Sequence, residues 1–219
     1  MGSWVQMGGE SIKITPEMTR IHAHLCGDGY ISRYKEKRDE RDIRKYNRKK
    51  EKREVFIVGY TNSEPTLIEI FRNDIKRIHN SKLKMTLNKK KREIKVKSKK
   101  LFNIFQQLGV GNSRTWSIPQ EIFKNTKLAK EWLRAYFDDE AHVEKGRFRI
   151  RVKSVNKDGL KQVKELLAKL KIKAKIRDLT NAYLLEISGK ENVVNFYLKI
   201  GFSHPKKLSS PWKSHPPQC

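Results

Sequence analysis

The same order of predicted elements occurs twice in this chain, and the duplication limits the possible folds more than any other feature. In each run, hydrophobic periodicity predicts a helix, two strands, a helix, two strands and a closing helix. The closing segments 102–109 (FNIFQQLG) and 194–201 (VNFYLKIG) also resemble one another at an offset of 92 residues. Two homologous halves are the simplest interpretation, although any two amphipathic helices that end in glycine share part of this likeness.

The predicted elements follow from periodicity and from helix caps. The first helix should begin at Pro16, where Thr15 can cap its first turn. The first run comprises helices over 16–27, 64–80 and 98–108 and strands near 30–33, 55–61, 83–87 and 93–97. The second run comprises helices over 128–139, 157–170 and 191–200 and strands from 141 and near 147–153, 172–177 and 183–187.

The duplication predicts two domains, one over 11–110 and one over 128–202. Between them, 111–127 should be a linker that leads into the second opening helix, with Trp116 buried against one of the domains. A proline-rich tail follows over 203–219. We expect this tail to be draped or disordered, because proline fits neither a helix interior nor a central strand.

The charge of the chain predicts a polyanionic partner. Fifty Lys and Arg against 24 Asp and Glu give a net charge of +26. Nucleic acid is favoured over a membrane, because no apolar run approaches the roughly 20 residues of a spanning helix. Only two cysteines and no signal segment indicate a reducing, intracellular location: cytoplasmic and nucleoid-associated, or organellar in a eukaryote. The lead over 1–10 is expected to be flexible and without a role in the fold.

An acidic residue stands at the end of each opening helix. The two segments are 21–29 (IHAHLCGDG) and 133–141 (LRAYFDDEA), and their acids, Asp28 and Glu140, lie 112 residues apart. These segments resemble the LAGLIDADG motif of homing endonucleases, in which each helix ends in an essential acid. The resemblance extends over both repeats, and the order of elements is that of the family.

Small residues match the same motif on both helices. Ala23 and Ala135 stand at its first glycine, and Gly27 stands at its small seventh residue. Such residues let two helices approach closely, so that the acids at their ends lie side by side. Asp139 departs from the pattern at the second small position, and we expect its side chain to point outward.

A single insertion reconciles the two offsets. The acids are 112 residues apart and the closing segments 92, so the first half carries about 20 additional residues. The segment 34–53 is 20 residues long, with eleven basic and five acidic residues, where the second half has only a short turn near 144–146. We expect a charged, solvated loop there, poorly ordered without DNA and lying along the DNA flank.

The family resemblance implies an α+β fold of two pseudo-symmetric α-β-β-α-β-β-α repeats. Two antiparallel sheets would form a saddle over double-stranded DNA, with the opening helices packed together between them. It further implies a monomeric, intron-encoded endonuclease that makes double-strand breaks in a long target and leaves short 3′ overhangs.

The resemblance also implies the roles of individual residues. Asp28 and Glu140 would be catalytic and would bind the metal, for which Mg²⁺ is expected because the available ligands are hard oxygens. Lys153, at the end of a strand, would orient water or stabilise charge, and Lys97 could serve as well.

Strands with alternating basic and apolar residues predict a cationic face on each sheet. Ile150 and Val152, for example, alternate with arginines, and a sheet with one such face suits the major groove of DNA. These faces scarcely mix charge signs in the sequence. The predicted DNA-binding residues are Lys84, Lys95, Lys97, Arg147, Arg149, Arg151, Lys173, Lys175 and Arg177.

Other functions stay open. An RNA-binding intron maturase, with intron RNA as its partner, and a DNA-binding protein without cleavage are compatible with the same fold, and a basic ribosome-associated protein is a more distant alternative. The presence of both acids favours the enzyme. A zinc site at His22, His24 and Cys26 is disfavoured, because His24 faces away from the other two on a helix.

Overall fold

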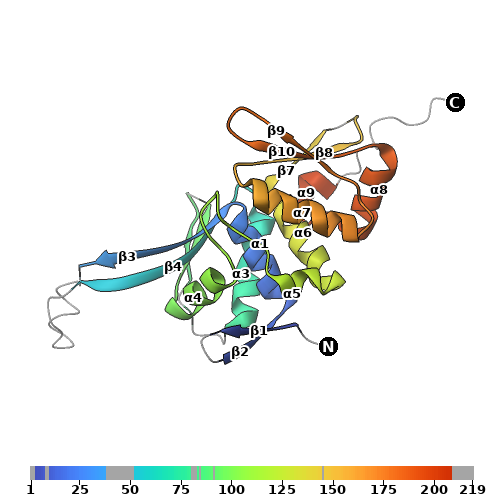
Figure 1. Ribbon diagram of the computed structural model, residues 1–219. Coiled ribbons are helices and arrows are strands. Elements are labelled where there is room, and N and C mark those ends of the chain that lie inside the picture. Colours follow the sequence, from blue (N-terminus) through green and yellow to red (C-terminus); the bar gives the residue numbers. More distant parts are fainter. Residues whose placement is uncertain are drawn as a thin grey trace.

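Two four-stranded antiparallel sheets with the same strand order organise the computed structural model (Figure 1). It describes residues 3–7, 10–37, 52–79, 83, 85–90, 92–144 and 146–208. The first sheet has the order β3 (Gly29–Glu36), β4 (Arg53–Thr61), β6 (Glu93–Lys97), β5 (Met85–Asn88). The second has the order β7 (Ala141–Glu144), β8 (Arg149–Ser154), β10 (Tyr183–Ser188), β9 (Lys175–Asp178). This repeated topology confirms the predicted α+β fold.

Helices back each sheet, and two central helices lie between the sheets (Figure 1). The central pair is α1 (Pro16–Cys26) and α6 (Thr126–Glu140). The flanking helices are α3 (Pro65–Ile78), α4 (Lys99–Gln107), α7 (Lys157–Lys169) and α8 (Lys190–Lys199), with a short α5 (Gln120–Phe123) before α6. As predicted, α1 begins at Pro16, and the Thr15 hydroxyl accepts a hydrogen bond from the Met18 amide at 3.3 Å.

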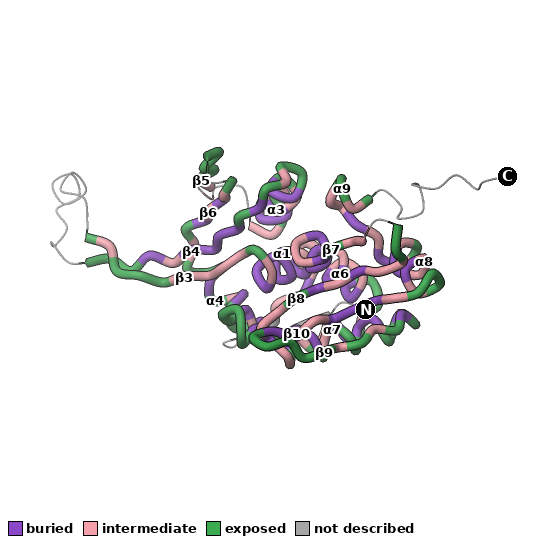
Figure 2. Tube along the Cα trace, turned by 90° about the horizontal axis from the view of Figure 1, so that it is seen from above, coloured by how far each residue is buried: buried purple, intermediate pink, exposed green. Residues whose placement is uncertain are grey.

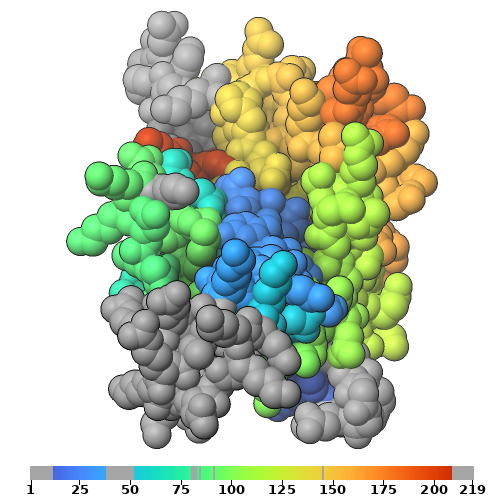
Figure 3. Space-filling view, turned by 90° about the vertical axis from the view of Figure 1, so that its left-hand side faces the viewer, coloured from blue at the N-terminus to red at the C-terminus, as the bar shows by residue number. Residues whose placement is uncertain are grey.

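The core extends without a break from one half of the chain to the other. On the face shown in Figure 3, the first half (blue to green) lies directly against the second (yellow to orange). Trp116 is buried, as expected, at 4% exposure. A Cβ on Gly159 would lie 2.4 Å from the Trp116 ring, so α7 approaches this linker residue as closely as only glycine permits.

The N-terminal segment contradicts the expectation of a lead without a role in the fold. Ser3–Met7 (β1) pairs antiparallel with Glu10–Ile14 (β2), and Val5 lies opposite Ile12. Two runs with β-branched residues on either side of a Gly-Gly pair are a hairpin signal, which outweighs the reading of these glycines as a flexible lead.

The ends of the predicted charged loop are strand instead. β3 and β4 stay paired out to Glu36 and Arg53, and both ends project from the body as a two-stranded ribbon (Figures 1 and 2). The Arg53 guanidinium donates to the Glu36 carboxylate at 2.9 Å across this ribbon. The loop was therefore predicted too long at both ends, and its remainder, 38–51, lies outside the described residues.

Two further expectations fail near the C-terminal end of the chain. The strand predicted from residue 172 begins only at Lys175. The turn that follows α7 occupies the residues before it: Lys171 is in the left-handed region (φ 60°), and the Ile172 amide donates to the Leu167 carbonyl at 3.0 Å. In the tail, Pro205–Leu208 form a helical turn, α9, with proline at its first position, where its missing donor costs nothing. Residues 209–219 lie outside the described part of the chain.

Candidate functional site

The two central helices are joined by small residues and by polar pairs. Ala23 and Ala135 are both buried at the contact. A Cβ on Gly27 would lie 2.9 Å from an oxygen of Asp139, so the helix ends approach closely although Asp139 occupies a position where the motif has a small residue. Polar contacts between the helices are Arg20–Glu131 (2.7 Å), His22–Trp132 (3.0 Å) and His24–Asp139 (2.9 Å).

Asp139 points inward, and the prediction that it faces outward is wrong. Its side chain is fully buried and lies 2.9 Å from the His24 ring nitrogen. The Tyr60 hydroxyl donates to it at 2.6 Å, and the Asn62 amide lies at 3.4 Å. Burial lowers the pKa of His24, but the Asp139 carboxylate outweighs this effect, so the net shift is upward. A buried carboxylate is acceptable here because a cation and two donors surround it.

Asp28 lies in the turn between α1 and β3, where Asn62 holds it. The Asn62 amide donates to one carboxylate oxygen at 2.8 Å. Although Asp28 stays accessible to solvent, partial desolvation raises its pKa, and the neighbouring Asp139 adds to the rise, to about 6. Lys207 and Asn62 act in the opposite direction. For Asp28, desolvation and the negative charge of Asp139 therefore outweigh the nearby positive charge.

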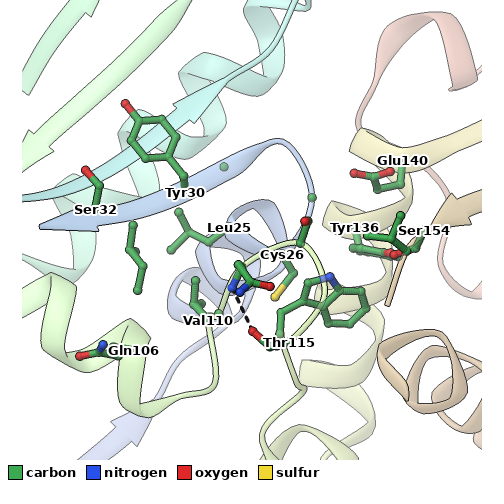
Figure 4. A pocket seen from close by; sticks show the side chains of 18 of the residues that line it. Leu25, Cys26, Tyr30, Ser32, Gln106, Val110, Thr115, Tyr136, Glu140 and Ser154 are labelled. Atoms are coloured by element: carbon green, nitrogen blue, oxygen red, sulfur yellow. Dashed lines mark hydrogen bonds between the residues drawn. The ribbon is translucent and has the colours of Figure 1, made fainter. Parts of the chain in front are cut away.

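Glu140, the last residue of α6, lines a cavity of about 840 Å³. Burial, then Asp28 and Asp139, raise its pKa to about 7. Figure 4 shows Glu140 and Ser154 on one side of the cavity, opposite β3. Within the described residues no hydrogen bond or ion pair holds the Glu140 carboxylate, so its oxygens can accept a ligand.

Lys153 lines the same cavity as Glu140 and is exposed on β8. This position is compatible with the proposed contact to water or substrate, and the role stays a prediction. The alternative residue, Lys97, is also exposed, and its ammonium lies 3.9 Å from Glu36. Lys97 is thus on the ribbon side of the first sheet.

Lys207 was missed by sequence reasoning, although its charge acts on both acids. Its ammonium donates to the last carbonyls of α6, at 2.6 Å to Asp138 and 3.2 Å to Phe137. It lowers the pKa of Asp28 and of Glu140, against the larger effects that raise them. No pattern in the sequence marked this lysine, because its contact with α6 depends on how the chain folds back after α8.

The acid pair suits a hard divalent cation. Two carboxylates with raised pKa values at one helix contact repel each other, and a cation relieves that repulsion. Within the described residues no group of three or more His, Cys, Asp or Glu side chains could hold a metal by itself. Further ligands would have to be water or substrate oxygens.

The two histidines considered for a zinc site have separate partners. His22 contacts Leu108 and Trp132, whereas His24 contacts Asp139.

Most of the predicted DNA-binding residues lie on the outer faces of the sheets. Strand residues on these faces are Lys95, Lys97, Arg149, Arg151, Lys175 and Arg177. Arg147 is exposed in the turn before β8, whereas Lys173 precedes β9 and is not part of the sheet. Lys84 lies outside the described residues.

The expectation that these faces scarcely mix charge signs is wrong. Lys95 lies 3.0 Å from Glu93 on the first sheet. On the second, Arg149 lies 3.4 Å from Glu144, and Arg177 lies 3.3 Å from Glu186. Glu144 and Glu186 come from strands next to those of their arginines, and strand-by-strand alternation does not reveal which residues meet across a sheet. Glu93 lies on the same strand as Lys95, two residues before it.

Comparison with known proteins agrees with this geometry. Residues 127–201 match the family model of the LAGLIDADG-like domain. The chain also superposes on a structure of I-DmoI in complex with DNA and manganese, with a TM-score of 0.61 and 22% identity, over 89% of this chain and 97% of that one. The chain carries a duplicated LAGLIDADG fold. The resemblance inferred from its two motifs is thereby confirmed.

The chain also resembles one further solved structure and two curated proteins, and it spans only part of the length of each. Full-length DUF199/WhiA from Thermatoga maritima superposes with a TM-score of 0.54 and 16% identity, over 90% of this chain and 57% of that one. A replication factor C small subunit from Thermococcus kodakarensis is 29% identical over 160 residues, which are 69% of this chain and 18% of that protein. An elongation factor 2 from Methanopyrus kandleri is 35% identical over 77 residues, 35% of this chain and 6% of that protein. The chain thus spans less than a fifth of these curated relatives.

No helix in the described part of this chain is both long enough and apolar enough to cross a membrane.

Proposed function

We propose that this protein is a metal-dependent DNA endonuclease of the homing type. One observation carries the proposal: Asp28 and Glu140, one from each repeat, stand at the ends of two helices in contact, and Asp28 raises the pKa of Glu140. A repelling acid pair would be a needless cost in a protein that only binds DNA. The solved structures that share the fold include the homing endonuclease I-DmoI.

Asp28 and Glu140 would hold the divalent cation, and we propose Mg²⁺, since I-DmoI has been crystallised in the presence of magnesium and of manganese. When bound, such a cation activates water and stabilises the departing oxygen of a phosphodiester. Asn62 fixes the orientation of Asp28 through its 2.8 Å hydrogen bond. Lys207 reduces the repulsion between the acids, and Lys153 would orient the attacking water.

Double-stranded DNA is the proposed partner, bound by one copy of the chain across its two sheets. A long target with cleavage that leaves short 3′ overhangs is part of this proposal. The two curated relatives bear unrelated names, and the segments that they share with this chain make up only 18% and 6% of their own length. A segment common to unrelated proteins supports a mobile module, so an intron-encoded origin and an origin within a host protein are both compatible with the proposal.

The test is cleavage of DNA from the gene's own insertion locus, in its intact form without the inserted element. Linear products with Mg²⁺ and none with EDTA are expected, and sequencing of the ends gives the overhang. Tight binding to DNA without nicking in the presence of any divalent metal would instead favour a DNA-binding protein. Binding to intron RNA in preference to DNA would favour a maturase.

Cleavage should depend steeply on pH. Asp28 and Glu140 have pKa values raised to about 6 and about 7, and only their ionised forms bind a cation. The single-turnover rate should therefore fall as pH drops from 8 towards 6, because protons compete with Mg²⁺. Raising the Mg²⁺ concentration should move the midpoint to lower pH, whereas DNA binding in EDTA should change little over this range. A constant rate between pH 5 and 8 would contradict the acid-pair assignment.

A further inference from the structure

On the outer face of the second sheet, one glutamate, Glu186, lies among basic side chains. Strand register places His142, Arg151, Glu186 and Lys175 in one row across all four strands. Residues next to this row, such as Leu185, are buried on the opposite face. The row therefore points towards the side where DNA is proposed to bind.

Glu186 is only 5% exposed although it lies on this outer face. One carboxylate oxygen is 3.5 Å from Arg149 on β8, and the other is 3.3 Å from Arg177 on β9. Its two cross-strand neighbours, Arg151 and Lys175, are also basic. Cationic side chains from both neighbouring strands therefore cover this carboxylate.

A second glutamate completes the arrangement at the edge of the sheet. Glu144 on β7 forms ion pairs with Arg149, at 3.4 Å, and with Arg151. Arg149 thus lies between two carboxylates, and each of the three arginines has at least one. We call Glu144, Arg149, Arg151, Arg177 and Glu186 the arginine–glutamate cluster.

This cluster is poorly suited to holding the DNA backbone. Phosphate contacts supply affinity without sequence information, and a fixed carboxylate among the cations repels phosphate. Base edges are different, because arginine donates two hydrogen bonds to O6 and N7 of guanine, the most common specific contact in the major groove. An arginine already held by a carboxylate loses little further rotamer freedom on binding.

We propose that the arginine–glutamate cluster is a base-reading site, in which Glu144 and Glu186 orient the three arginines towards guanine-containing base pairs and exclude phosphate. This inference rests on the proposed function, since it specifies how that enzyme recognises its target. The outer face of the first sheet also has an arginine–glutamate pair, Arg53–Glu36, but it lies out on the ribbon. Within the sheet, Lys95 beside Glu93 is a point charge without the planar donor pair of arginine. The half-site under the second sheet should therefore carry more guanine-dependent sequence information.

The test compares Glu186→Gln with Glu165→Gln, which makes the same change of charge on the exposed surface of α7. Each full-length variant selects binders from duplex DNA with randomised positions, in EDTA, and the bound pool is sequenced. We expect Glu186→Gln to lose preference at one or two G·C pairs by roughly 5- to 150-fold each, the range of a well-placed bidentate contact. It should also bind random duplex DNA several-fold more tightly than Glu165→Gln.

The outcomes separate this inference from the proposed function. Wild-type protein that binds no DNA would contradict the proposed function. If wild-type protein selects a sequence and Glu186→Gln selects the same sequence with equal preference, the base-reading site is wrong and the enzyme proposal stands. An equal loss in Glu165→Gln would also overturn the inference. Glu144→Gln, at the edge of the sheet, provides the same comparison through Arg149 and Arg151 if Glu186→Gln does not fold.

Discussion

Replacing either acid should abolish double-strand cleavage and leave DNA binding intact. Asp28→Asn and Glu140→Gln preserve the size of each side chain but remove a charge that the cation needs. Metal catalysis contributes several kcal/mol to the barrier, and each 1.36 kcal/mol is tenfold in rate, so cleavage should fall by roughly 1000-fold or more. The affinity of each variant for DNA in EDTA should equal or exceed that of the wild type, because the substitution removes a carboxylate charge that repels phosphate.

Matched controls exist on the exposed surface of α7. Asp158→Asn and Glu165→Gln make the same chemical changes at exposed positions that do not line the cavity of Glu140, and both variants should cleave at the wild-type rate. Gel separation of nicked and linear plasmid distinguishes two arrangements of metal. If Asp28 and Glu140 share their cations, each variant loses both strand cleavages, which we expect from their common helix contact; independent sites would leave nicking. Full cleavage by Asp28→Asn would remove the central proposal.

Local patterns in the sequence sufficed for most of the fold. Thr15 and Pro16 define the start of α1 through a cap that involves only neighbouring residues. Alternation of Ile150 and Val152 with arginines gave the faces of β8. The 92-residue offset found for the closing segments also relates α3 to α7, which begin at residues 65 and 157. Such features depend on the nearest few residues, which the sequence displays directly.

The candidate site was predicted only where a motif marks it. Asp28 and Glu140 occupy fixed motif positions, whereas the orientation of Asp139 depends on His24, 115 residues away in the chain. Lys207 reaches α6 because the tail folds back after α8, and no local pattern predicts that path. Asn62 could have been found, because the 92-residue offset relates it to Ser154, which lines the cavity beside Glu140.

The largest expected effect on stability comes from Asp139. Asp139→Ala removes the partner of a fully buried His24 and leaves the Tyr60 hydroxyl without its 2.6 Å acceptor. Breaking a buried pair in this way costs about 3–5 kcal/mol, and relief of repulsion on Asp28 and Glu140 offsets part of that cost. We therefore expect the free energy of unfolding to fall by roughly 3 kcal/mol at pH 6, measured by urea denaturation.

The loss should also depend on pH with a definite sign. The folded-state pKa of His24 is raised above the ordinary histidine value of 6.5, so the stabilisation by Asp139 is fully present below pH 6.5 and is lost as pH rises through the raised pKa. The difference in unfolding free energy between wild type and Asp139→Ala should therefore shrink from pH 6 to pH 9. Tyr60→Phe removes only the hydrogen bond to Asp139, so its effect on stability should stay nearly constant over the same range. A difference for Asp139→Ala that grows with pH would show that His24 is not the cation that holds this carboxylate.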